Sequence, residues 1–291
     1  MYYPYQKVID YFSTLESRLG YDLLLGGVKH FGYYPSEKMD ISEKKAQELM
    51  QDLIAKKLKL SKNELVLDAG CGQGLVACYL AVKYGSNITG ITITPFEVIR
   101  ARRLAQRLEI FNKVKFLKMD YTKMNFPDNY FDSIYTIESL VHAYDLKKAL
   151  NEFKRILKPD GRIVFFEYSM AEDKKLSEFD KKSGLKFTKL YDWVINKGAM
   201  PGLKKLRHGS LPVILKTQGF INIKEENIID QIKPSLTRLR NLALIPYQLI
   251  KLFRLREVFF NTAVAAEFFP VLLKRPEQDL FRYNITVAKK P

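Results

Sequence analysis

The chain has 291 residues, 47% of them hydrophobic, which is the composition of a globular protein with one large core or one core and an elaborated cap. The net charge of +16 favours contact with nucleic acid, an anionic membrane or an acidic ligand, and a generally lysine-rich proteome explains it equally well. No run approaches the ~18 to 20 apolar residues of a membrane span, and the N-terminus lacks the apolar core of a signal peptide. The close spacing of Cys71 and Cys78 argues against a disulfide, so we expect a cytoplasmic protein of one domain with insertions.

The first sixty residues predict two helices separated by a loop. Residues 2–20 read as a helical lid with an apolar face made of Ile9, Phe12, Leu15 and Leu19. Residues 26–35 are rich in Gly and Tyr, which predicts a loop in contact with a ligand or a neighbouring element. Ser42 is the expected N-cap of a helix that ends near residue 60.

A glycine-rich turn organises the chain. Residues 64–68 are mostly apolar and end in Asp68, and Gly70, Gly72 and Gly74 then lead into an apolar helical stretch. Glycines let the backbone approach a ligand with no Cβ in the way, and the free N–H groups of the following helix favour a polar or anionic group. This arrangement predicts a strand, a nucleotide-binding turn and a helix N-terminus.

After the turn, expected strands alternate with helices. The strands are placed at 87–92, 114–119, 132–137, 162–168, 220–225 and 282–288, with helices at 95–108, 146–157 and 210–218. Such alternation implies right-handed β-α-β units and a mostly parallel sheet of seven strands with helices on both faces, and we expect the last strand to pair antiparallel with the sixth. A ligand is expected beyond the carboxyl ends of the strands, at the edge that carries Asp68, Thr92, Asp120 and Glu138.

The remaining segments predict a cap. Residues 171–208 are charged and irregular, and residues 231–256 contain six Lys or Arg and no acid. Because Pro234 can start a helix and Pro246 should break one, we expect two short basic amphipathic pieces there. They are expected to line an apolar pocket and touch an anionic membrane, unless the basic face is merely solvated. The predicted organisation is therefore a lid over 1–60, a core over 61–170, and the last core strands with cap insertions over 171–291.

Several motifs carry a family resemblance. They are the glycine turn, Asp120-Tyr121, the 126–132 lead into the fourth strand, and Leu157-Lys158-Pro159-Asp160-Gly161. Together they resemble a class I S-adenosylmethionine (SAM) dependent methyltransferase with its Rossmann-like α/β fold, over about 60–230. The stretches 137–143 and 167–170 are similar to the sterol C-24 methyltransferase branch and its tocopherol and cyclopropane-fatty-acid relatives.

The resemblance implies SAM as cofactor and assigns residues to it. The glycine turn would hold its methionine part, the pair Asp120 and Tyr121 would lie beside its adenine, and an aromatic loop would present π faces to the sulfonium. Most such enzymes hold the ribose with an acid at the end of the second strand, whereas this chain has Thr92, with Glu97 where the resembled branch has Gln. A cap or turn role for Asp120 and core packing of the Tyr pair are the alternatives. The implied cofactor residues are Tyr33, Tyr34, Asp68, Gly70, Gly72, Gly74, Thr92, Glu97, Asp120 and Tyr121.

Glu138 and His142 are the candidates for acid–base catalysis. They follow the fourth strand and are four residues apart, so one helical turn would bring them to one face, whereas His30 and His208 are taken as structural. The resemblance predicts methyl transfer to a small lipid-like, isoprenoid or sterol-type acceptor, with carbon as the favoured atom and oxygen or nitrogen as alternatives. A nucleic-acid-binding methyltransferase is a further alternative, but the Asn/Asp-Pro-Pro-Tyr/Phe turn of base-methylating enzymes is absent and Ile137-Glu138-Ser139-Leu140 stands in its place. A dehydrogenase would need longer glycine spacing, and we expect no metal site.

Overall fold

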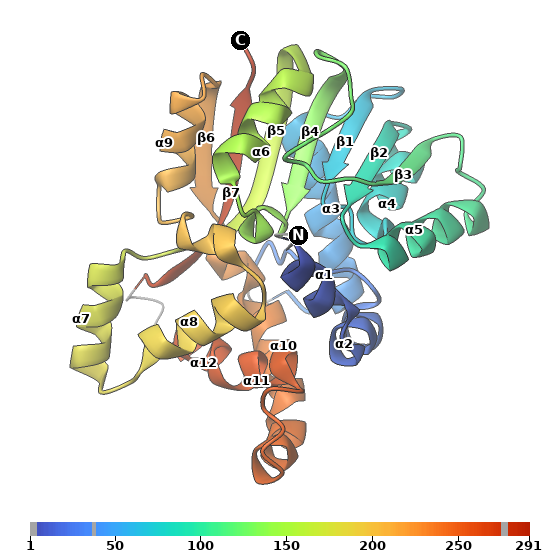
Figure 1. Cartoon of the computed structure of the whole chain (residues 1–291). Helices are drawn as coiled ribbons and strands as arrows, with labels where there is room; N and C mark the ends of the chain where they lie inside the picture. Colours follow the sequence, from blue (N-terminus) through green and yellow to red (C-terminus); the bar gives the residue numbers. More distant parts are fainter. Residues whose placement is uncertain (1–4, 37–38, 275–278) are drawn as a thin grey trace.

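A computed structural model of the chain describes residues 5–36, 39–274 and 279–291. Within them a seven-stranded sheet has the order β3-β2-β1-β4-β5-β7-β6, as Figure 1 shows. All neighbours pair in parallel except β7, which is antiparallel to both β5 and β6. This confirms the predicted fold class and the pairing of the last strand. The strands are β1 (Leu65–Ala69), β2 (Asn87–Thr92), β3 (Val114–Lys118), β4 (Phe131–Ile137), β5 (Leu157–Met170), β6 (Ile221–Asn227) and β7 (Phe281–Lys289).

Helices cover both faces of the sheet, and each face has its own apolar core. One core contains buried residues of α3 (Glu43–Leu58), α4 (Leu75–Tyr84) and α5 (Pro95–Arg107). The other contains those of α6 (Leu146–Ile156) and α9 (Ser210–Thr217). Ser42 caps α3 as predicted, because its side chain accepts from the backbone N–H of Lys45. The two cores fix the sheet rigidly, so the carboxyl ends of its parallel strands form a stable platform.

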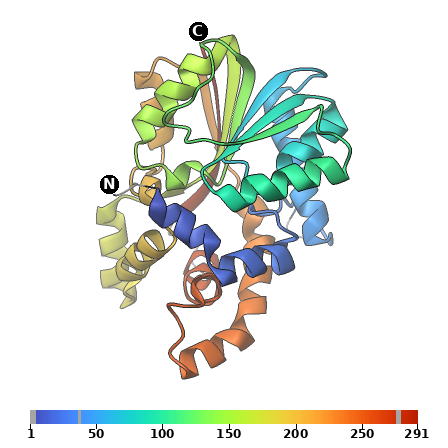
Figure 2. The ribbon, with the colours of Figure 1, turned by 45° about the vertical axis from the view of Figure 1, so that its right-hand side comes forward.

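A helical cap lies against this edge of the sheet and below it in Figure 1. Turned by 45°, Figure 2 shows the N-terminal helices next to the long cap helix. No helix in the described ranges is long and apolar enough to cross a membrane. The cap elements are α1 (Gln6–Ser13), α2 (Leu15–Leu25), α7 (Asp173–Ser183), α8 (Phe187–Lys197), α10 (Ile229–Leu252), α11 (Phe260–Glu267) and α12 (Phe269–Lys274). Two short 3₁₀ helices, η1 (Leu140–His142) and η2 (Pro201–Lys204), contact each other and β5.

The N-terminal segment differs from its prediction. The expected single helix over 2–20 is broken at Thr14, whose extended backbone (ψ 149°) ends α1, and residues 2–4 lie outside the described part. The break rotates the second half of the segment, so Leu15 and Leu19 are exposed and do not continue the apolar face expected with Ile9 and Phe12.

The cap is also more helical than the sequence suggested. Residues 171–208 contain α7 and α8, whose few buried residues, such as Leu176 and Phe179, are spaced among many charges. Residues 229–252 form one helix although Pro234 and Pro246 lie inside it, so the prediction of two pieces was wrong. Pro246 and Leu242 are both exposed, which lets water bond the Leu242 carbonyl that the proline leaves without its helical donor.

Candidate active site

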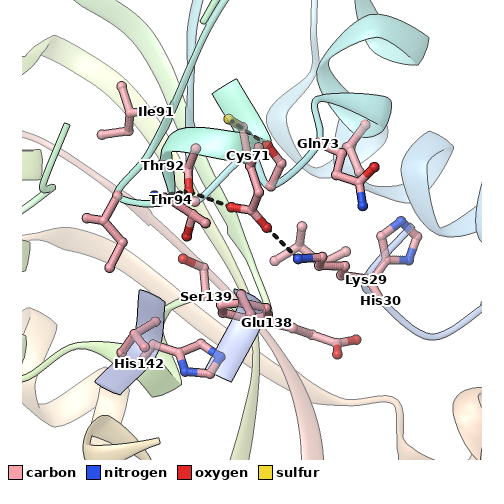
Figure 3. Close-up of a pocket in the computed structure, with 18 of the residues that line it drawn as sticks. Lys29, His30, Cys71, Gln73, Ile91, Thr92, Thr94, Glu138, Ser139 and His142 are labelled. Carbon is pink, nitrogen blue, oxygen red and sulfur yellow. Dashed lines mark hydrogen bonds and ion pairs between the residues drawn. The ribbon is translucent and has the colours of Figure 1, made fainter. Parts of the chain in front are cut away.

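Two adjoining cavities open at the carboxyl edge of the sheet. The first lies where β1, β2 and β4 end, and Figure 3 shows its lining. The second has a free volume of about 320 Å³, about twice the 160 Å³ of the first, and is lined mainly by apolar side chains of α2, α10 and α11. Six residues line both cavities and so form their junction: Tyr11, Lys29, His30, Glu138, Tyr168 and Met200.

The glycine turn forms one wall of the first cavity. Gly70 and Gly72 both line it with positive φ angles of 103° and 51°. A Cβ on Gly72 would project into free space, since its nearest neighbours, the Lys29 side chain and Glu97 Oε1, are 3.9 Å away. A Cβ on Gly70 would overlap the Ser139 side chain. Gly72 therefore leaves the room that a ligand lying on the turn needs, as the resemblance to SAM enzymes requires.

Two residues assigned to the cofactor lie behind this wall. A Cβ on Gly74 would come within 2.8 Å of Phe116 and Ala101, so the third glycine permits close packing of α4 and does not line the cavity. Asp68 is fully buried, and its carboxyl faces the buried Tyr135 hydroxyl of β4. Burial raises the pKa of Asp68 to about 7. The turn itself separates Asp68 and Gly74 from the lining of the cavity, and their contact with the cofactor stays a prediction.

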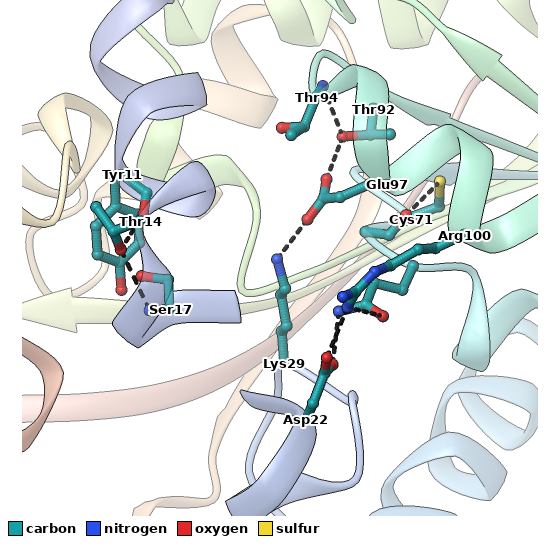
Figure 4. Close-up of polar contacts among 12 residues, drawn as sticks. Tyr11, Thr14, Ser17, Asp22, Lys29, Cys71, Thr92, Thr94, Glu97 and Arg100 are labelled. Atoms are coloured by element: carbon teal, nitrogen blue, oxygen red, sulfur yellow. Dashed lines mark hydrogen bonds and ion pairs between the residues drawn. The ribbon is translucent and has the colours of Figure 1, made fainter. Parts of the chain in front are cut away.

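A carboxylate does face the first cavity beside β2, but it comes from α5. Thr92 Oγ1 donates to Glu97 Oε2 over 2.7 Å, and Lys29 forms a salt bridge with Oε1 of the same group (Figure 4). The Lys29 ammonium also lies 4.1 Å from the centre of the Phe12 ring. Glu97 occupies the first turn of its helix, where the helix dipole favours a negative charge. Thr92 and Glu97 therefore form one hydrogen-bonded unit at the cavity wall, and its contact with the ribose stays a prediction.

Asp120 and Tyr121 also line the first cavity, as predicted. Asp120 Oδ1 accepts from the backbone N and the hydroxyl of Thr122, over 2.7 and 2.9 Å. Tyr121 donates its hydroxyl to the Ser139 carbonyl over 3.2 Å. Asp120 therefore has the turn-forming role that was the alternative, and it contributes to the cavity wall as well.

Tyr33 and Tyr34 lie outside both cavities. The backbone N–H of Tyr33 donates to Ala46, and the Tyr34 hydroxyl donates to Glu43 Oε2 over 3.1 Å. Burial raises the pKa of Tyr34 to about 12. The pair packs the loop on α3, because Gly32 sits directly against Ala46 and leaves no gap there, and its expected place at the sulfonium stays a prediction. The same loop does reach the first cavity earlier, with Gly27 to His30.

Glu138 lies at the junction of the two cavities. It follows β4 with a left-handed backbone (φ 51°), an uncommon conformation for a residue with a side chain. Its carboxyl accepts from the Phe31 backbone N–H over 3.0 Å and from the hydroxyls of Tyr283, over 3.0 Å, and Tyr168. Burial raises the pKa of Glu138 to about 8, against the lowering effect of its hydrogen bonds from Phe31 and Tyr283.

His142 lines the first cavity but has other partners. Its Nδ1 is 2.8 Å from the Ala199 carbonyl, and its ring packs against Phe12 with the ring centres 5.2 Å apart. Burial lowers the pKa of His142 to about 4. No hydrogen bond joins it to Glu138 in the part of the chain that the structure describes, because Glu138 turns away before η1 begins. The expected single helical face is therefore wrong, while the catalytic roles of both residues stay predictions.

Sequence reasoning missed four residues around this junction: Lys29, Glu167, Tyr168 and Tyr283. Lys29 stands in the loop from which the Tyr pair was chosen, and Tyr283 comes from β7, more than a hundred residues away from Glu138. Buried Glu167 accepts from the backbone N–H groups of Ser139 and Leu140 and so fixes the turn after β4. A usable signal was the last part of β5, where Glu167 and Tyr168 follow the buried apolar residues 163–166 of the same strand.

Comparisons with known proteins bear on this geometry. Residues 67–165 match the family model described as a methyltransferase domain. A relative in Talaromyces variabilis named S-adenosyl-L-methionine-dependent Diels-Alderase iccD is 32% identical over 98% of this chain and 95% of its own length. The chain belongs to the class I SAM-dependent methyltransferase family. SAM is therefore its cofactor, and the open space over Gly72 beside the Thr92–Glu97 unit fits that ligand.

Other known proteins resemble the chain in part of its sequence or in its fold. A sterol 24-C-methyltransferase from Pneumocystis carinii is 39% identical over 38% of this chain, a match that spans only 29% of that protein. The 4+2 cyclase SpnF shares the fold with a TM-score of 0.70 and 23% identity, covering 96% of both chains. A geranyl diphosphate C-methyltransferase from Streptomyces coelicolor A3(2) does so with a TM-score of 0.71 and 15% identity, covering 99% and 98%. The chain is thus an enzyme of the SAM-dependent methyltransferases whose core resembles the sterol 24-C-methyltransferases in sequence, and it shares its fold with the two solved structures.

Proposed function

We propose that this enzyme transfers the methyl group of SAM to an apolar, lipid-like acceptor of isoprenoid or sterol type, with carbon as the acceptor atom. The observation that carries the proposal is the junction of the two cavities, where the cofactor pocket opens into a larger, mostly apolar space. A dry apolar space positions the acceptor and excludes water from the reacting centre. SAM supplies an electrophilic methyl group there.

The chemistry on carbon requires a base at the junction. When the π electrons of an alkene form the new C–C bond, the acceptor becomes a carbocation, and loss of a neighbouring proton restores the double bond. Glu138 is the ionisable carboxyl that lines both cavities, and its enclosed position suits proton transfer near neutral pH. We assign the proton to its carboxylate, with Tyr168 and Tyr283 holding the group in place by their hydroxyls.

The decisive experiment incubates the purified enzyme with methyl-labelled SAM and lipid extracts, followed by mass spectrometry of the labelled product. We expect label in an apolar product, together with an equal amount of S-adenosylhomocysteine. Label in RNA or in water-soluble amines, with none in the lipid fraction, would overturn the acceptor class.

A cyclisation is the second candidate function. The relative that matches the whole chain, including the cap, is named a Diels-Alderase, whereas the sterol methyltransferases match only 107 to 120 residues. In this case the apolar cavity would hold a folded polyene, and SAM would stay intact as a bound cation. Supplying linear polyenes and measuring S-adenosylhomocysteine separates the two: ring formation without its release favours cyclisation, and stoichiometric release favours transfer.

A further inference from the structure

The mouth of the apolar cavity lies between α2 and α10. Leu24 of α2 and Leu242 of α10 both line the cavity, and they are 42% and 45% exposed. The Arg238 side chain joins the helices at this point by donating to the Leu24 carbonyl over 3.0 Å. Figure 2 shows the two helices side by side. The cavity therefore opens through a rim that is itself apolar.

The apolar surface continues beyond this rim. On α2, Leu23 is 78% exposed, and on the distal part of α10, Ile245 is 80% exposed. Leu249, Leu252 and Phe253 recur at helical spacing along the same side and are exposed as well. An exposed patch of this kind marks an interaction site in a folded protein. We call these residues, Leu23, Ile245, Leu249, Leu252 and Phe253, the apolar tip.

The charge around the apolar tip indicates its partner. Lys251 and Arg254 are exposed and form no salt bridge with any described residue. Acids on neighbouring segments are already paired: Asp22 with Arg100, Glu257 with Lys197 and Glu267 with Arg256. A second copy docked on this surface would bring like charges together, which disfavours a symmetric dimer. An anionic lipid headgroup layer complements the basic residues, and its acyl chains complement the exposed apolar side chains.

We infer that the apolar tip rests in an anionic membrane surface, so that the acceptor passes from the bilayer through the α2–α10 mouth into the apolar cavity. The inference rests on the proposed apolar acceptor, and it replaces the expected contact along all of 231–256. The first half of α10 is excluded because Ile232, Ser235 and Leu236 are buried in the protein. The distal half alone is free to enter the headgroup region.

The test is sedimentation with vesicles of phosphatidylcholine, with and without phosphatidylserine, at low and high salt. We expect binding to the anionic vesicles that weakens as salt screens the charges. The double variant Ile245→Ser/Phe253→Ser should bind roughly tenfold or more weakly, because two exposed apolar side chains no longer enter the bilayer. Lys251→Gln/Arg254→Gln should lose the preference for phosphatidylserine.

A matched control is Phe111→Ser/Val213→Ser, which removes two equally exposed apolar side chains far from the tip in the sequence and should leave vesicle binding unchanged. Thermal unfolding and SAM calorimetry of each variant show that the fold and cofactor site are intact. Three results would each overturn the inference: no vesicle binding at low salt, an equal loss of vesicle binding in the control variant, or a concentration-dependent dimer that Ile245→Ser abolishes. Methyl transfer to a detergent-dispersed acceptor is measured in parallel, so failure of the proposed function shows as absent transfer despite vesicle binding.

Discussion

Glu138 has a left-handed backbone, its carboxyl accepts three hydrogen bonds, and it lies between the two cavities. Uncommon backbone conformations persist only where the surrounding structure holds them, and they concentrate at functional sites. The turn after β4 is held by Glu167, and β7 holds the Glu138 carboxyl through Tyr283. The structure thus fixes this one carboxyl from two sides.

Replacing Glu138 by Gln tests its role as the base. The amide keeps the size and much of the hydrogen bonding but cannot take a proton, so SAM affinity should hold while turnover falls by roughly 10²- to 10⁴-fold. Calorimetry and a methyl-transfer assay measure the two effects. The exposed Glu109→Gln is the control and should alter neither. Turnover within a few fold of the parent enzyme would make Glu138 structural.

The acidity of Glu138 predicts a pH dependence. Its pKa is raised to about 8, so its ionised fraction, and with it turnover, should rise with pH up to about 8 and level off above. Because the pKa of Glu138 is raised from 4.5, its value in the unfolded chain, the folded protein keeps this proton up to a higher pH. Its contribution to stability therefore falls as pH rises from about 4.5 to about 8. A pH–rate profile unchanged in Glu138→Gln would contradict the assignment.

His142 and Glu138 were expected on one helical face as candidates for acid–base catalysis, but they share no hydrogen bond in the described structure. Independent groups change the free energy additively, whereas members of one catalytic unit do not. The losses of His142→Ala and Glu138→Gln should therefore multiply in the double variant.

Among the elements, the glycine turn offers a matched pair of substitutions. Gly72→Val should abolish SAM binding, because its side chain would enter the free space of the first cavity. Gly184 ends α7 with a comparable φ of 69° and has open surroundings. Gly184→Val therefore introduces similar backbone strain away from the cavity, and this variant should bind SAM normally. Equal loss of calorimetric heat in both variants would point to strain alone.

Tyr34 lies in the loop between α2 and α3 and anchors this loop to its neighbours. Its hydroxyl donates to Glu43, which also accepts from Ser235 of α10 over 2.7 Å. Tyr34→Phe should therefore lower the free energy of unfolding by about 1 to 3 kcal/mol without changing SAM affinity. Denaturant unfolding measures the first effect. Tyr34→Leu also removes the π face, and weakened SAM binding in Tyr34→Leu but not in Tyr34→Phe would support the role at the sulfonium.

The sequence predicted the core elements well because hydrophobic runs and turn residues mark them locally. The glycine turn, Ser42 as N-cap and the ends of six strands were placed within two residues, whereas β5 begins at Leu157, before its predicted start at 162. The cap was harder, since charged helices such as α7 bury few residues and the exposure of Pro246 cannot be read from the chain. Contacts such as Tyr283 with Glu138 depend on strand order, which no local pattern encodes.

At the scale of the whole molecule, the first cavity joins the lid, the glycine turn, α5 and the loops after β3 and β4. A ligand that bridges these parts stabilises all of them at once. SAM at about a hundred times its dissociation constant should raise the free energy of unfolding by about 2.7 kcal/mol and the melting temperature by several degrees. NAD should produce no shift, and a comparable shift with NAD would count against the SAM site.

The position of β7 has a consequence for biosynthesis. It is the last strand to leave the ribosome, yet it lies between β5 and β6 and carries Tyr283. Until it inserts, two strand edges are open to wrong pairing with other chains, and Glu138 lacks one of its donors. The glycine turn and the strands around it are complete much earlier. A nascent chain can therefore form the cofactor half of the site long before the half around Glu138 is complete, so we expect a product that stops before residue 281 to be aggregation-prone and inactive.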